Sequence, residues 1–96
     1  MSDQTPDALT RLGFYRAPDR DGIAVYRCMH RSGLDELIVS VMVYEGAWNG
    51  AAALTTPTET VLISESMYAL PHDLIAWAAI TIAEFHAAHL SASVTR

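Results

Sequence analysis

Residues 37–44 in the middle of the chain form a nearly continuous apolar run that is interrupted by Ser40. Because successive side chains of a strand point to opposite faces, a predicted strand between Glu36 and Glu45 has apolar side chains on both faces. One face carries Leu37, Val39, Val41 and Val43, and the other carries Ile38, Met42 and Tyr44. Because a strand that is apolar on both faces belongs in the interior of a sheet, residues 36–45 are predicted to form the central strand.

Glycine, proline and small polar residues divide the rest of the chain into short segments. The predicted elements are a helix at 6–12, strands at 14–16, 23–31, 36–45, 51–55 and 60–64, a loop at 46–50, a helix at 71–90 and a polar tail at 91–96. We expect an α+β fold in which an antiparallel β-meander of four to five strands (14–64) carries a long C-terminal helix across one face, together with a short N-terminal helix. With 96 residues, the chain is expected to form a single domain, 1–96.

The long C-terminal helix has a wide apolar arc, which spans about 220° of a helical wheel. The arc contains Leu74, Ile75, Ala78, Ala79, Ile82, Ala83, Phe85, Ala87 and Leu90, and only Asp73, Trp77, Thr81 and Glu84 remain for water. This arc exceeds what one sheet face can cover, and 51% of all residues are hydrophobic. We therefore expect a homodimer that is sealed partly by the alanines of this helix, which are Ala76, Ala78, Ala79, Ala83, Ala87 and Ala88.

The chain is acidic, and its charges are unevenly distributed. It has a formal net charge of -5, no lysine, and five of its six arginines within the first 31 residues. Those residues also hold four acids, whereas residues 32–96 hold seven acids and one arginine. Binding of nucleic acid or of an anionic membrane requires concentrated positive charge, so we expect neither as a direct partner. The acidic balance favours a basic protein as the partner.

No segment suits a membrane span or a secretory signal. The longest apolar run, 74–83, is shorter than the roughly 20 residues that a span needs. The N-terminus is acidic and polar where a signal peptide would be basic and then apolar. The single cysteine, Cys28, cannot form an internal disulfide, which fits a reducing compartment. We expect a cytoplasmic protein.

Four residues are candidate metal ligands. Cys28 and His30 are two apart on a predicted strand, and His86 and His89 are three apart on the predicted helix, so each pair points to one side. Structural zinc pairs usually lie on tight knuckles, however, and a histidine in the last turn of a helix can cap free carbonyl groups. We expect structural or interface histidines, with no metal and no cofactor.

The sequence contains no catalytic or nucleotide-binding motif, and we expect no enzymatic activity. Trp77 shares its predicted solvent-facing stripe with Asp73 and Glu84, which suits an arginine of a partner protein. Alternatively, Trp77 lies flat on an edge of its own sheet or in a homodimer seam. Trp48 is either a lid on the core or an exposed anchor. The predicted protein-binding residues are Asp73, Trp77 and Glu84, extended by Asp35, Glu36 and Trp48.

The last third of the chain resembles part of a known class of proteins. The strand 60–64 followed by residues 70–90 is similar to the closing strand and helix of small acidic secretion chaperones, which are dimers that bind an unfolded segment of a client. The chain departs from that pattern because its middle strands leave no room for a helix between them. No site residue follows from the resemblance.

The leading hypothesis is a non-enzymatic protein-binding module, an inhibitor, adaptor or chaperone that docks an acidic and aromatic surface on a basic partner protein. Its size and charge suit a phage- or plasmid-type inhibitor of a nucleic-acid-binding host defence protein. The alternative is a small-ligand or metal-binding domain. Such a domain would use Cys28, His30, His86 and His89, or the pocket between the long helix and the sheet.

Overall fold

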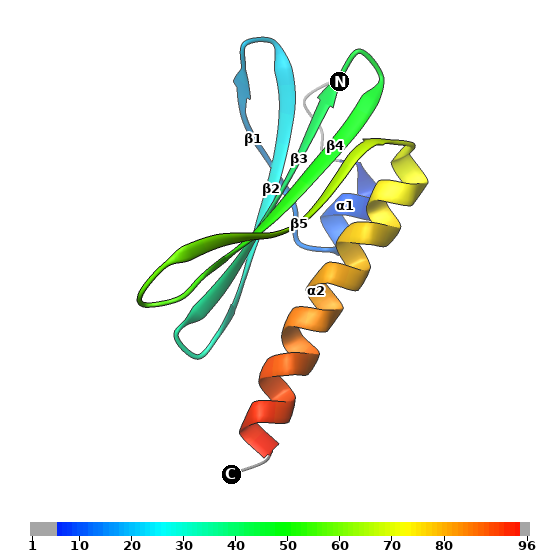
Figure 1. The fold of residues 1–96 in the computed structure, drawn as a ribbon. Coiled ribbons are helices and arrows are strands. Elements are labelled where there is room, and N and C mark those ends of the chain that lie inside the picture. The colour runs from blue at the N-terminus through cyan, green and yellow to red at the C-terminus, as the bar shows by residue number, and fades with distance from the viewer. Residues whose placement is uncertain (1–5, 95–96) are drawn as a thin grey trace.

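Five strands and two helices follow one another along the chain, and the expected α+β fold class is confirmed. The elements are α1 (Asp7–Arg11), β1 (Tyr15–Arg20), β2 (Ile23–Ser32), β3 (Asp35–Tyr44), β4 (Ala47–Thr55), β5 (Thr60–Ala69) and α2 (Pro71–Val94). The computed structural model describes residues 6–94, and the side-chain surroundings of residues 6–88. The strands form one open antiparallel sheet with α2 along one face (Figure 1).

Tight turns make the sheet a simple meander in the order β1-β2-β3-β4-β5. Between β1 and β2, Asp21 and Gly22 have φ angles of 53° and 80°, and between β3 and β4, Glu45 and Gly46 have φ angles of 49° and 80°. Positive φ at both central residues is typical of a type I′ turn, whose twist matches that of the strands it joins. β3 lies at the centre of the sheet, as its two apolar faces predicted.

The hydrophobic core lies between the sheet and α2. Its buried residues are Tyr26, Cys28, Leu37, Val39, Val41 and Ala52 on the strands, Leu74, Ala78, Ile82 and Phe85 on α2, and Leu9 and Phe14 near the N-terminus. The α2 residues recur at spacings of three and four, which places them on one side of the helix. Leu9 is the buried residue of α1 and attaches that short helix to the same core.

The sheet has two unlike faces because successive residues of a strand point in opposite directions. On β3, Val39 and Val41 point toward α2 and are fully buried. Ile38, Ser40 and Met42 point to the other face, which neither helix covers (Figure 1). We call these two faces the α2 face and the open face.

Three strands, β1, β4 and β5, differ from the prediction by more than one residue. β1 continues to Arg20 rather than ending at residue 16, because the turn is limited to Asp21 and Gly22. β5 extends to Ala69 rather than ending at residue 64, so the meander continues beyond 14–64. The pairing of β4 with β5 shifts between Ala52 and Ala53 and again between Trp48 and Gly50. Such irregularities interrupt the two-residue alternation, and the sequence pattern therefore stops although the strand continues. The predicted loop at 46–50 was also wrong, because the turn is limited to Glu45 and Gly46 and β4 starts at Ala47.

The helix ends also differ from the prediction. α2 continues to Val94 instead of ending at residue 90, so the expected polar tail at 91–96 was wrong for 91–94. That segment contains no glycine or proline that would stop a helix, and residues 95–96 lie outside the described part. α1 is one residue shorter at each end than the predicted 6–12. Within residues 6–94, neither helix combines the length and hydropathy needed to cross a membrane.

Candidate functional site at the β5 edge and α2

β5 forms an edge of the sheet, with no strand partner on its outer side among the described residues. Three consecutive large apolar residues of β5 are exposed, Val61 by 42%, Leu62 by 55% and Ile63 by 48%. A long apolar edge strand presents unpaired backbone N–H and C=O groups, with which a strand of another chain can pair. The β5 edge is therefore a surface suited to strand addition.

The opposite edge, β1, lacks these properties. It has six residues where β5 has ten, and it contains Pro18, which cannot donate a backbone hydrogen bond. Arg16 on β1 donates hydrogen bonds to the carboxylate of Asp19 and to the hydroxyl of Tyr26. Short length, proline and charge are the features by which proteins protect an edge strand. Strand addition is thus favoured at β5 and disfavoured at β1.

A notch of about 320 Å³ opens between β5 and α2. Its lining residues are Leu54, Ile63, Ser64, Thr81, Glu84, Phe85 and Ala88. The walls are mostly apolar, and Glu84 is the one charged residue among them. Ligand pockets of about 300 to 1,000 Å³ are usual for small molecules, so this notch is at the lower limit. It suits one long side chain with an apolar stem and a cationic head, which is the chemistry of arginine and lysine.

Acidic residues lie around the β5 edge. Asp73 and Glu84 are exposed on α2, Glu59 is exposed in the turn before β5, and Glu65 is exposed on β5 itself. Asp73 and Glu84 are eleven positions apart on α2, which corresponds to about three helical turns and roughly 16 Å. Residues 32–94 contain no arginine or lysine. Asp73 Oδ1 lies 3.2 Å from His72 Nε2, and Glu59, Glu65 and Glu84 form no ion pair with a described residue, so this part of the molecule carries an excess of negative charge.

Trp77 does not face solvent, so the expectation of a solvent-facing stripe was wrong at this position. Its indole Nε1–H donates a hydrogen bond to Ser64 Oγ at 2.8 Å, and its ring lies against Gly50 of β4. Thr81, which was assigned to the same stripe, is 8% exposed. The alternative in which Trp77 lies flat on its own sheet describes the observed position. Trp77 thus holds α2 against β4 and β5.

The remaining predicted binding residues lie elsewhere. Trp48 belongs to β4 and packs against the core, in agreement with the lid interpretation. Asp35 and Glu36 are half-buried at the start of β3, and Glu36 accepts a hydrogen bond from Arg31 Nε at 3.3 Å. Of the six predicted residues, Asp73 and Glu84 therefore remain as exposed acids on one side of α2.

Two of the candidate metal ligands form a hydrogen-bonded pair. His30 Nδ1 lies 3.1 Å from His86 Nε2, and His30 Nε2 lies 3.2 Å from the carbonyl oxygen of Leu12. Because a carbonyl oxygen only accepts, His30 Nε2 carries a hydrogen, and in the neutral ring its Nδ1 accepts the Nε2–H of His86. Among the residues whose side chains are described, no group of three or more metal-ligating residues comes together. The side chain of His89 lies outside that part.

Cys28 belongs to the core and not to a reactive site. Its side chain is 1% exposed, and burial raises the pKa of the thiol to about 11. The thiol therefore remains protonated near neutral pH, whereas a nucleophilic cysteine needs a lowered pKa.

Sequence reasoning missed the apolar part of the site. Val61, Leu62 and Ile63 were assigned to a strand, but a strand's position at an edge depends on the strand order. The uneven charge distribution, which is visible in the sequence, was the signal that pointed to this region. No protein-family model matches the chain, and no curated protein and no solved structure matches it significantly.

Proposed function

We propose that this protein is a non-enzymatic protein-binding module that docks its β5 edge and the adjoining side of α2 on a basic partner protein. The observation that carries this proposal is the juxtaposition of exposed Val61, Leu62 and Ile63 with acids that no arginine or lysine of residues 32–94 offsets. Apolar contact supplies affinity, and complementary charge steers the encounter and selects the partner.

The geometry supports a partner segment that binds as an extended strand. Backbone groups of such a segment would pair with the open edge of β5, and one basic side chain would enter the notch with its cationic head at Glu84. A protein whose own function is to bind nucleic acid presents the required positive surface. Inhibition by occupying that surface is the mode of action we favour.

The experiment uses a synthetic ten-residue peptide of alternating lysine and valine as the probe, and a glutamate–valine peptide as its charge-reversed counterpart. Binding is measured by fluorescence anisotropy at several salt concentrations. The lysine peptide is expected to bind more weakly as salt rises, and Glu84→Arg should weaken binding about tenfold, equivalent to about 1.4 kcal/mol.

Glu45→Arg is the matched control, because Glu45 is an exposed acid in the turn between β3 and β4. It changes the net charge by the same amount and should leave the affinity nearly unchanged. Equal binding of the two peptides, or equal effects of the two substitutions, would refute docking at this surface. A partner captured from the native host can then replace the peptide in the same comparison.

A further inference from the structure

The open face of the sheet contains a hollow of about 640 Å³ on the side of β1 and β2. Its lining residues are Ala17, Pro18, Asp19, Arg20, Asp21, Val25, Arg27, Ser40, Met42 and Ala51. Ser40 is the register partner of both Arg27 on β2 and Ala51 on β4, so these three residues form one row across the sheet. The small side chains of Ser40 and Ala51 leave the hollow open between larger neighbours.

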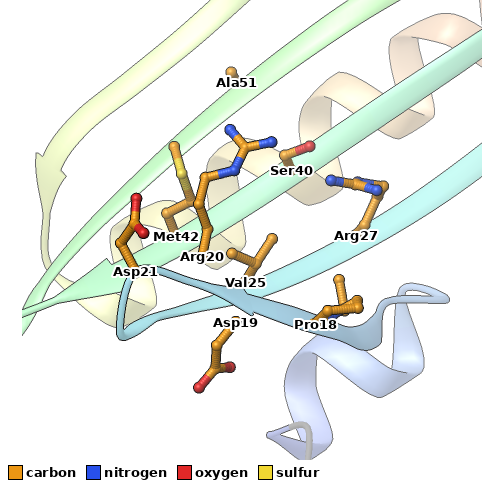
Figure 2. A pocket seen from close by; sticks show the side chains of 10 residues that line it. Pro18, Asp19, Arg20, Asp21, Val25, Arg27, Ser40, Met42 and Ala51 are labelled. Atoms are coloured by element: carbon orange, nitrogen blue, oxygen red, sulfur yellow. The ribbon is translucent and has the colours of Figure 1, made fainter.

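Two arginines extend over this hollow. Figure 2 shows Arg20 and Arg27 on either side of Ser40, with their guanidinium groups above the sheet. Neither forms an ion pair with a described residue, although Arg27 is half-buried. Two acids also line this hollow: Asp19 at the rim is bound to Arg16 with its carboxylate pointing away from the hollow, and Asp21 is exposed in the turn between β1 and β2, outside the row of Arg27, Ser40 and Ala51 (Figure 2). A partly buried guanidinium without a carboxylate partner gains free energy when an anion binds to it.

A second hollow of about 360 Å³ adjoins the first and shares Met42 and Ala51 with it. Tyr44, Met67 and Tyr68 contribute large apolar or aromatic side chains to its wall, and they are 54%, 57% and 79% exposed. The acid in this wall is Glu65, so the second hollow disfavours an anionic group. The two hollows therefore offer a cationic end and an apolar end along one surface.

We infer that the open face binds a small organic anion, with its carboxylate or phosphate between Arg20 and Arg27 and its apolar or aromatic body over Met42 and Ala51. Neighbouring strands are about 4.8 Å apart, so the distance from Arg27 on β2 to Ala51 on β4 is roughly 10 Å, about the length of a two-ring molecule that carries one anionic group. The molecule's net charge of -5 repels anions at long range, but salt screens this repulsion beyond about 8 Å. This site is on the opposite face from α2 and does not depend on the proposed function.

The test is a titration of the ¹⁵N-labelled protein, followed by amide chemical shifts, with four probes. 1-Naphthyl phosphate and 1-naphthoate carry an anionic group on an aromatic body, inorganic phosphate has no body, and 1-naphthol has no anionic group. Both naphthyl anions are expected to produce saturable shifts centred on Arg27, Ser40 and Ala51. Inorganic phosphate and 1-naphthol should bind at least tenfold more weakly.

Two substitutions decide whether the arginines hold the anion. Arg20→Gln and Arg27→Gln should each weaken binding of 1-naphthyl phosphate about tenfold. Because Arg20 is exposed, its substitution is not expected to affect folding. Arg11→Gln on α1 removes the same charge outside the hollow and should leave binding unchanged. The inference is overturned if no probe gives saturable shifts at these residues, if inorganic phosphate binds as tightly as the naphthyl anions, or if Arg11→Gln weakens binding as much as the other two substitutions.

Discussion

The ring of Trp77 on α2 lies directly against the backbone of Gly50 on β4. A Cβ added at position 50 would lie 2.9 Å from Cη2 and 3.1 Å from Cε3 of the indole ring, and closer still to Cζ3. Contacts at these distances between carbon atoms are repulsive, since the optimal separation is about 3.5 to 4.0 Å. Glycine at this position is thus explained by the space that the ring occupies, and not by its backbone conformation.

Gly50→Ala is therefore expected to destabilise the fold by about 1 to 3 kcal/mol, the usual cost of overpacking. Without the ring, alanine would be the better strand residue by about 0.5 to 1 kcal/mol, so the sign of the effect reports the contact. Urea denaturation of both proteins measures the difference.

The matched background for this measurement is Trp77→Leu, which removes the ring atoms that the new Cβ would meet. In that background the cost of Gly50→Ala should fall or reverse. An equal cost in both backgrounds would show that the close approach does not determine the choice of glycine.

The buried thiol of Cys28 is expected to make the free energy of unfolding decrease at high pH. Its folded-state pKa is about 11, against an ordinary value of 9.0, because burial disfavours the thiolate. Below pH 9 the thiol is protonated in both the folded and the unfolded state, and its contribution to stability is fully present. This contribution is lost as pH rises to about 11, because the unfolded state releases the proton first. With about 1.4 kcal/mol per pKa unit, the loss amounts to roughly 3 kcal/mol.

Denaturation curves at several values between pH 8 and 12 measure this loss. The chain has no lysine, so tyrosines are the main other side chains that titrate in this window. Cys28→Ala is the control, because it retains the tyrosines and removes the thiol. If the wild type and this variant lose stability in parallel, the thiol does not contribute.

α2 is apolar on both of its sides, although its core contacts use only one. Opposite Leu74 and Phe85, the exposed residues are Ala76, Ile80, Ala83 and Ala87, and Ile80 is 58% exposed. Ala78, which was included in the expected dimer seam, is fully buried in the chain's own core. Ala76, Ala83 and Ala87 remain available, and the expected homodimer would use them together with Ile80.

Ile80→Glu is expected to convert such a dimer to a monomer, because it would bury two unpaired carboxylates where the outer sides of two α2 helices meet. Light scattering at about tens of micromolar protein measures the mass; dimer dissociation constants span this range. Leu34→Glu is the control, since Leu34 is 83% exposed in the turn between β2 and β3. A wild-type monomer under these conditions would exclude self-association through α2.

At the scale of the whole molecule, the uneven distribution of charge along the sequence becomes an uneven distribution of charge across the sheet, because the strands are arranged in sequence order. The arginines of residues 6–31 lie on α1, β1 and β2, and the excess of acids lies from β3 to α2. Because each strand pairs with its neighbour in the chain, β1 and β2 lie at one edge of the sheet, and β4 and β5 lie at the other edge. The two proposed binding surfaces follow this division, with a basic partner at the β5 edge and an organic anion on the open face beside β1 and β2.

The sequence by itself determined the elements and their class. The nearly continuous apolar run of residues 37–44 identified β3 and its central place, and the helical spacing after Pro71 identified α2, because both patterns are local to one segment. The uneven charge distribution was also evident from the sequence, since it requires only a count of acidic and basic residues in each part of the chain. The full length of β5 was not predicted. Irregular pairing with β4 interrupts the alternation of side chains between the two faces of the strand near Ser64.

Only the tertiary structure decided which surfaces remain available. Trp77 shares a stripe of the helical wheel with Asp73 and Glu84, yet Gly50 leaves room for its ring and Ser64 accepts its hydrogen bond. The edge position of β5 and the row formed by Arg27, Ser40 and Ala51 depend on strand order and register. These features join residues that are distant in sequence, so their exposure is fixed by packing and not by the period of any single segment.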